Sequence, residues 1–368
     1  MECAAAPQQH QQSSPLVPPA EPSTGSGEPH HHYVNPLVSN FPAVVGPKLP
    51  CKYRVRRAIG RGAFSTVWLL INNETGETVV GKLSDTTHAS SANRAFAWAE
   101  VENMRCCHHP NIITLIETYE ANQIELYILE YANAGDLQTQ VDTRAQPPAN
   151  TNNGAPIPYR EEEVLVIFAQ LCLAIRYLHD RRIMHRDLKT PNVLLTRRGL
   201  IKLGDFGFSR QYQESVSGEV GNTFCGTPYY LAPELWQRQS YSYKADIWSL
   251  GVIIYELLAL RKPFQATNLS ELMEMVTRQS SFEPLPADRY SCELIQLVNQ
   301  MLSVDPNKRP SVCEILASPL FQQKALPILK INIRRIKNLE DAVQSQLVKD
   351  VDAVLRDTQN DASEPNSG

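Results

Sequence analysis

The chain has 368 residues, which is enough for one large two-lobed domain or two ordinary domains. Its formal net charge of -4 argues against a general affinity for nucleic acid or anionic lipid. The eight cysteines contain no C-x-x-C pair, which disfavours a zinc site. The longest apolar run, Ile247 to Leu260, is interrupted by Glu256 and is too short to span a bilayer. We therefore expect a soluble, cytoplasmic protein.

Residues 1–50 differ in composition from the rest of the chain. They contain ten of the 26 prolines, runs of Gln, Ser and Ala, a histidine triplet and only four charged residues. Such a segment cannot bury enough apolar surface to offset the entropy that ordering removes. We predict that residues 1–50 form a disordered N-terminal extension.

Residues 53–71 predict a β-hairpin with a turn of small residues. Tyr53–Ile59 alternates as a strand does, Gly60–Ser65 forms the turn, and Thr66–Ile71 returns as a second strand. A turn of this kind lets backbone N–H groups approach phosphate oxygens. Taken alone, the pattern also fits an ordinary hairpin.

Three further strands would complete a five-stranded antiparallel sheet. The first, Thr78–Leu83, carries a single cation, Lys82. The other two are predicted at Ile112–Tyr119 and Ile124–Glu130.

Helices are predicted on both sides of a surface loop. A helix at 92–107 carries Glu100 and stops at the His-Pro turn that follows. The Pro/Asn/Gly-rich stretch 146–158 predicts a loop. After it, residues 161–180 are apolar on most of a helical circumference, which predicts a buried helix, and a hydrophobic helix begins near Asp246.

The stretch from His185 to Gly207 places polar residues between apolar runs. Residues 193–203 predict two short strands joined by a turn, so Asp187, Asn192 and Asp205 would meet at one end of this hairpin. Carboxylate and amide oxygens are hard ligands that suit Mg²⁺. A carboxylate left free of the metal could accept a proton from a hydroxyl nucleophile. Phosphoryl transfer requires this combination of metal, base and positioning.

This stretch resembles the catalytic loop and magnesium motif of eukaryotic protein kinases, since it reads HRDLKTPN and then DFG. The resemblance includes the Gly-rich turn, although Ser65 stands where the third glycine is usual. It includes the V-A-I-K strand motif, with Val80 and Gly81 as departures. Farther on, it includes an A-P-E motif, whose Glu234 would form a salt bridge with Arg309.

The resemblance covers about residues 53–322 and implies a protein kinase domain there, followed by a tail at 323–368. The implied fold class is α+β. It is the bilobal protein-kinase fold, with a small antiparallel-sheet lobe and a larger, mostly helical lobe.

The resemblance also implies a role for each motif residue. Catalysis would depend on Asp187, which accepts the proton of the substrate hydroxyl, on Lys189, which steadies the γ-phosphoryl group, and on Asn192. Mg²⁺ would be bound by Asn192 and Asp205. The ATP site would be formed by Ile59, Gly60, Arg61, Gly62, Ala63, Phe64, Ser65, Thr66, Val67, Val80, Lys82, Glu100, Leu129, Glu130, Ala132, Leu194 and Asp205.

The segments GDFGFSR and TFCGTPYYLAPELW are similar to those of NIMA-related (NEK) serine/threonine kinases of the kinetoplastid type. The implied reaction transfers the ATP γ-phosphate to Ser/Thr hydroxyls of protein substrates, and we further expect association with the cytoskeleton. A pseudokinase scaffold is an alternative. It is disfavoured because the chain has all five polar residues that kinase activity requires, namely Lys82, Glu100, Asp187, Asn192 and Asp205. A small-molecule kinase is another, disfavoured because the Thr227 loop and the A-P-E motif serve a docked polypeptide.

Two further expectations concern the tail and the control of activity. Apolar residues recur every three or four positions at Ile333, Ile336, Leu339, Val343, Leu347, Val351 and Val354. We predict one amphipathic helix that either lies on the large lobe or self-associates through 333–354. We also predict an activating phosphorylation at Thr223, by an upstream kinase or by the protein itself, with Arg186 as the partner of the phosphate.

Overall fold

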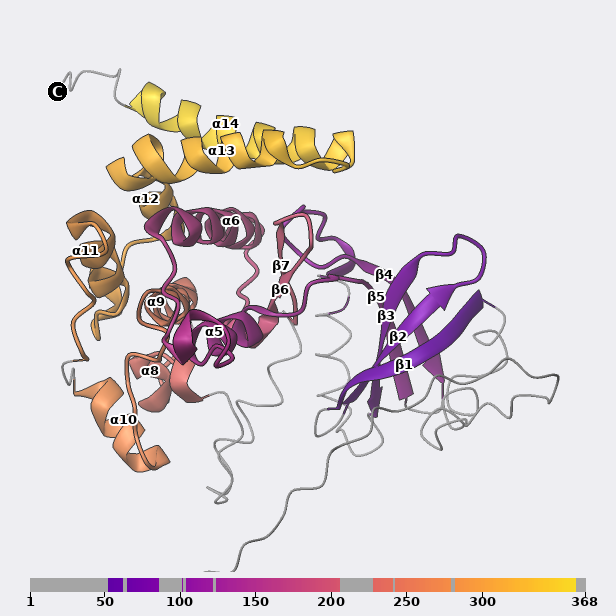
Figure 1. The fold of residues 1–368 in the computed structure, drawn as a ribbon, viewed down its shortest axis with the longest axis horizontal. Coiled ribbons are helices and arrows are strands. Elements are labelled where there is room, and N and C mark those ends of the chain that lie inside the picture. The colour runs from indigo at the N-terminus through magenta and orange to yellow at the C-terminus, as the bar shows by residue number, and fades with distance from the viewer. Residues whose placement is uncertain are drawn as a thin grey trace, which may run out of the picture.

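The computed structural model describes residues 52–61, 65–85, 101, 104–121, 124–205, 228–240, 242–278 and 282–361. The extension 1–50, the turn residues Gly62–Phe64, Glu100 and Thr223 lie outside these ranges. Figure 1 shows a β-sheet on one side and a mostly helical region on the other. This arrangement confirms the predicted bilobal α+β fold.

The small lobe is a five-stranded antiparallel sheet, as predicted, and its strands lie in the order β1-β2-β3-β5-β4. Its strands are β1 (Tyr53–Arg61), β2 (Ser65–Asn72), β3 (Thr78–Asp85), β4 (Leu115–Ala121) and β5 (Ile124–Glu130). Alternate residues face opposite sides of a strand, so Leu126 and Ile128 of β5 join a cluster within the small lobe, whereas Tyr127 and Leu129 join the main core. The sheet therefore connects both cores.

One strand of the sheet begins later than predicted, and the packing of the sheet explains the glycine at position 81. The strand predicted from Ile112 begins only at Leu115, because Ile112 forms an isolated bridge with Leu203 of the other lobe. Gly81 has a packing reason: a Cβ atom there would lie 2.7 Å from Cδ1 of Leu70. Leu70 thus occupies the space that a larger side chain at position 81 would need.

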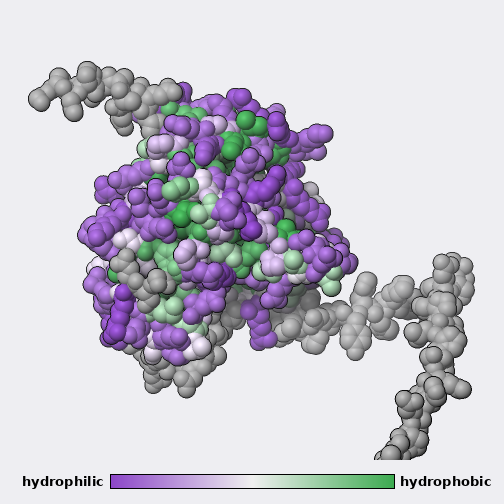
Figure 2. Space-filling model, turned by 60° about the vertical axis from the view of Figure 1, so that its left-hand side comes forward, coloured by the Kyte–Doolittle hydropathy of each residue, from purple (hydrophilic) through white to green (hydrophobic). Residues whose placement is uncertain are grey.

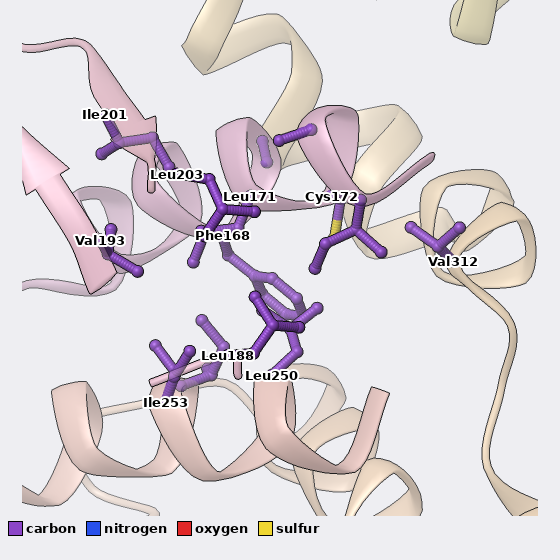
Figure 3. Close-up of a cluster of buried hydrophobic side chains, with 14 of the residues drawn as sticks. Phe168, Leu171, Cys172, Leu188, Val193, Ile201, Leu203, Leu250, Ile253 and Val312 are labelled. Atoms are coloured by element: carbon purple, nitrogen blue, oxygen red, sulfur yellow. The ribbon is translucent and has the colours of Figure 1, made fainter. Parts of the chain in front are cut away.

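The large lobe is organised around α9 (Tyr243–Ala259), in which every residue from Ala245 to Leu258 is buried. The helix α6 (Glu161–Asp180) begins and ends as predicted, and the Glu163 carboxylate accepts a hydrogen bond from the Arg160 N–H at its start. In Figure 3, Phe168 and Leu171 of α6 point toward Leu250 of α9, and Leu188 lies between the two helices. This packing anchors Leu188, the residue that follows Asp187.

The remaining elements of the large lobe are short. The predicted hairpin is confirmed as β6 (Val193–Leu195) and β7 (Ile201–Leu203), and 146–158 is a loop with one short turn. The other helices are α5 (Leu137–Ala145), α8 (Pro233–Trp236), α10 (Leu269–Thr277), α11 (Cys292–Met301) and α12 (Val312–Ala317). Short helical turns occupy Asn152–Gly154, Thr190–Asn192, Pro228–Tyr230, Pro306–Lys308 and Phe321–Ala325.

The prediction of one continuous tail helix is wrong. The tail forms α13 (Leu326–Arg335) and α14 (Asp341–Asp361), separated by a break in which Asn338 has a left-handed φ of 58°. α13 lies beside α6, and α14 lies beside α13 and α12 (Figure 1). The apolar stripe is used within the chain: Ile333, Leu347, Val351 and Val354 are buried in the main core.

The outer surface is mainly hydrophilic on the face shown in Figure 2, where hydrophobic residues appear between polar ones. None of the described helices combines the length and the hydrophobicity needed to cross a bilayer.

Candidate active site

The loop that holds Asp187 is fixed to the centre of the large lobe. The backbone N–H groups of His185 and Arg186 donate to the two carboxylate oxygens of Asp246, each at 3.0 Å. Asp246 is fully buried on α9. Arg186 adopts a left-handed φ of 67°, a strained conformation for an arginine that these hydrogen bonds help to hold.

The imidazole of His185 connects this loop to the segment before Asp205. Its Nδ1 accepts the Asp187 N–H at 3.2 Å, so in the neutral ring the proton is on Nε2, which donates to the Gly204 carbonyl at 3.1 Å. Burial lowers the pKa of His185 and so favours this neutral form. The ring therefore sets the spacing between Asp187 and Asp205.

Asp187, Lys189 and Asn192 form one polar cluster. The Asn192 amide nitrogen donates to the backbone carbonyl of Asp187 at 2.8 Å and to its carboxylate at 2.9 Å. The Lys189 ammonium lies 2.7 Å from the same carboxylate oxygen. A carboxylate held in this way has a fixed direction, and a cation stands beside it where charge would develop on a transferring group.

Asp205 lies opposite this cluster and pairs with the small lobe. Its carboxylate is 2.5 Å from the ammonium of Lys82, on β3. The Asp205 side chain is 46% exposed, and although neighbouring atoms remove part of its solvation and so favour the neutral acid, the charge and hydrogen bond of Lys82 outweigh this, so the pKa of Asp205 lies below its ordinary value. The predicted partner of Lys82, Glu100, lies outside the described residues.

The donor set suits Mg²⁺. Both amide hydrogens of Asn192 are used toward Asp187, which leaves its amide oxygen for a metal, and Asp205 is ionised. Within the described residues no cluster of three His, Cys, Asp or Glu side chains could hold a metal. Mg²⁺ is commonly held by one or two such side chains together with substrate phosphates, so these two residues fit it.

The residues predicted around the nucleotide lie on neighbouring strands. Gly60 pairs with Val67, Val67 with Lys82, and Val80 with Leu129. Val80 and Leu194 pack against the core cluster that contains Leu129 and Ala132, and Ile59 is 38% exposed at the edge of the sheet. The other described members of the set are Arg61, Ser65, Thr66 and Glu130.

Sequence reasoning missed two groups around this site. Lys202, in the apolar strand β7, is buried and places its ammonium 2.6 Å from the Glu130 carboxylate. The Tyr230 hydroxyl donates its hydrogen to the buried Glu256 carboxylate at 2.6 Å, and the Thr190 hydroxyl lies 2.7 Å from the Tyr230 oxygen. A lysine inside an apolar strand and a glutamate inside an apolar helix were the available signals.

The predicted salt bridge between Glu234 and Arg309 is confirmed. The guanidinium nitrogens of Arg309 donate to both carboxylate oxygens of Glu234 at 2.8 Å, and both side chains are buried. This pair fixes α8 to the segment before α12.

Comparison with known proteins agrees with this geometry. The family model described as "Protein kinase domain" matches residues 53–321. "Putative serine/threonine-protein kinase A" of Trypanosoma brucei brucei is 42% identical over 305 residues, which cover 83% of this chain and 68% of that protein.

Two further relatives show the same likeness. "Putative serine/threonine-protein kinase B" of the same organism is 41% identical over 305 residues, 83% of this chain and 68% of that protein. "Serine/threonine-protein kinase Nek3" of Mus musculus is 38% identical over 267 residues, 72% of this chain and 48% of that protein. This chain therefore belongs to the protein kinase family, and within that family it is similar to the trypanosome kinases and the Nek kinases.

Proposed function

We propose that this chain is a serine/threonine protein kinase that uses ATP and Mg²⁺. The observation that carries the proposal is the meeting of two parts: the Asp187–Lys189–Asn192 cluster of the large lobe and the Lys82–Asp205 pair between the lobes. Relatives that align with most of the chain carry names of serine/threonine kinases.

Each residue of the site has a proposed task. Asp187 orients the substrate hydroxyl and accepts its proton at a carboxylate oxygen as the oxygen attacks the γ-phosphorus. Lys189 stabilises the negative charge on the transferring phosphoryl group, and Lys82 holds the α- and β-phosphates. Asn192 and Asp205 hold Mg²⁺, which supplies charge stabilisation when bound. Most of the rate gain comes from positioning.

Nucleotide binding is assigned to the strands of the small lobe. We propose that the turn from Gly60 to Ser65 covers the phosphates, that Glu100 pairs with Lys82 in the active arrangement, and that Val80 and Leu194 enclose the adenine. We also assign the N-terminal extension to residues 1–50, the kinase domain to residues 53–322 and the tail to residues 323–368.

Three further assignments stay predictions. A phosphate on Thr223 would place about two negative charges next to the Arg186 guanidinium, beside Asp187, and order the site. Self-association through 333–354 would have to use residues outside the buried stripe, and sedimentation would detect it. Association with the cytoskeleton in the cytoplasm would be visible by microscopy of tagged protein.

Incubation of the purified chain with Mg-ATP and casein tests the activity. Wild-type protein should phosphorylate serine or threonine, whereas Lys82→Met and Asp205→Ala should each lower kcat by about 100-fold or more. Lys52→Met is the matched control, because Lys52 also forms an ion pair in the small lobe, with Glu117, but lies outside the site. Undiminished activity in Asp205→Ala would refute this mechanism, and inactive wild-type protein would favour the scaffold alternative.

A further inference from the structure

The tail helix α14 does more than cover an apolar surface. Its buried residues Leu347, Val351 and Val354 alternate with polar residues that reach toward α6 and the segment before β4. A cavity of about 190 Å³ lies at this junction, lined by His109, Tyr177 and Asp350 among others. The contact therefore joins the tail to a part of the chain outside the large-lobe helices.

The central contact is between Asp350 of α14 and His109. One Asp350 oxygen accepts from Gln346 at 2.7 Å, whereas the other is buried, has no hydrogen-bond partner among the described residues, and lies 3.6 Å from Nε2 of His109. Nδ1 of His109 accepts the Asn111 N–H at 3.0 Å, so the proton of the neutral ring is on Nε2 and faces Asp350. Burial, Lys202 and Arg181 lower the pKa of His109 to about 3, which keeps the ring neutral.

From His109 the hydrogen bonds continue into the strand before Asp205. The Asn111 side chain donates to the Ile201 carbonyl at 3.0 Å, and the Leu203 N–H donates to the Asn111 carbonyl at 2.8 Å. The Ile113 N–H donates to the Leu203 carbonyl at 2.9 Å. The position of 109–113 therefore sets the position of β7, and Asp205 follows β7 by two residues.

The same segment also reaches the strand that carries the nucleotide-side residues. The Glu130 N–H donates to the Thr114 carbonyl at 2.9 Å, and the Glu130 carboxylate accepts from the Thr114 N–H at 3.3 Å. The second oxygen of that carboxylate pairs with Lys202 of β7. Residues 109–114 thus lie between the tail on one side and both halves of the candidate site on the other.

We infer that α14 is a positioning element of the kinase site, and that Asp350 acts through His109 to hold β7 and Glu130 in register. Asp350 and His109 are positioning residues, because neither touches the site itself. The inference adds regulation by the tail to the proposed kinase function, and its kinetic readout rests on that function. Loss of the contact should loosen residues 111–113 and 201–205 while the apolar packing of α14 remains.

The test uses the full chain with Asp350→Ala, His109→Asn and the control Asp352→Ala. Asp352 is on the same helix but pairs with Lys330 of α13, so its loss weakens the tail without reaching His109. Hydrogen exchange of the Leu203 amide should become about threefold faster or more in Asp350→Ala and in His109→Asn, and stay unchanged in Asp352→Ala. The KM for ATP should rise by a similar factor in the first two variants, with a smaller effect on kcat.

Asp350→Asn provides the conservative comparison, because it keeps the shape of the side chain and a polar group facing Nε2 of His109. It should restore Leu203 exchange close to the wild-type rate. Equal Leu203 exchange in the wild-type and Asp350→Ala chains would overturn the inference, and Asp350→Leu, which removes both carboxylate oxygens but keeps the side-chain volume, decides it if the alanine chain does not fold. Casein phosphorylation by wild-type protein tests the proposed function separately, since the exchange measurement does not require activity.

Discussion

Replacing Arg309 by methionine should destabilise the large lobe strongly. The guanidinium makes two hydrogen bonds to Glu234 and three more to the backbone carbonyls of Ser303, Val304 and Lys244, at 2.7 to 3.1 Å. Methionine leaves the Glu234 carboxylate, only 4% exposed, without its counter-charge. A buried charge that loses its partner costs about 3–5 kcal/mol, and each carbonyl that loses its donor adds to this. We expect the free energy of unfolding to fall by at least about 3 kcal/mol.

Urea denaturation followed by tryptophan fluorescence measures this loss. The Trp248 ring lies 5.0 Å from the Arg309 guanidinium and reports on the site of the change. Arg278→Met is the matched control, because its pairing with Glu274 is exposed, and such pairs contribute about 0–1 kcal/mol.

A double-mutant cycle separates the pair from the backbone hydrogen bonds. Glu234→Met combined with Arg309→Met should cost less than the sum of the single changes, by about 2 kcal/mol or more, because neither charge is then left alone. Additive losses, or a loss below about 1 kcal/mol in Arg309→Met, would refute the reasoning.

Three other predictions concern packing, pH and phosphorylation. Gly81→Ala should overpack against Leu70 and lower the free energy of unfolding, measured by urea denaturation, by about 1–3 kcal/mol. Adding Leu70→Ala to the same chain should remove much of that penalty. A urea midpoint of Gly81→Ala equal to that of the wild type contradicts this prediction. His109 has a pKa of about 3 in the folded chain, so at a pH below its ordinary pKa it binds a proton only on unfolding, and stability falls as the pH falls. From about pH 7.5 to about pH 5 this lowers the free energy of unfolding by about 2 kcal/mol. The fall in the free energy of unfolding over this range should be smaller by that amount in His109→Asn. Phosphatase treatment should lower activity, and Thr223→Ala should reproduce that loss. Ser215→Ala and Ser217→Ala, which remove two other hydroxyl groups between Asp205 and Thr223, should not. Full activity in Thr223→Ala after incubation with ATP would place the switch elsewhere.

Local patterns predicted most of the fold. Helix 161–180 and strand 124–130 have strong periodicity and clear ends, and both have the predicted bounds. The break in the tail was missed because the three- and four-residue spacing continues across it, and no Gly or Pro marks it. Asn338 was the available signal, since asparagine adopts the left-handed conformation more readily than most residues.

Long-range partners were less accessible from the sequence. The motif spacing brought Asp187, Asn192 and Asp205 together, because a short hairpin determines their distance. The pairing of Lys202 with Glu130 and the contact of Asp350 with His109 join residues far apart in the chain, and no local periodicity specifies which strands or helices meet. Such contacts depend on how the lobes and the tail pack, which the fold alone determines.

The attachment of the catalytic loop to Asp246 has a consequence for how the two halves of the site tolerate change. Asp246 is fully buried on α9, so the half of the site that contains Asp187, the proposed proton acceptor, is attached to the buried central helix of the large lobe. The half that is proposed to bind nucleotide belongs to a five-stranded sheet with its own small core. In the proposed mechanism, substitutions that loosen the sheet away from Lys82 should therefore alter ATP affinity more than they alter the position of Asp187.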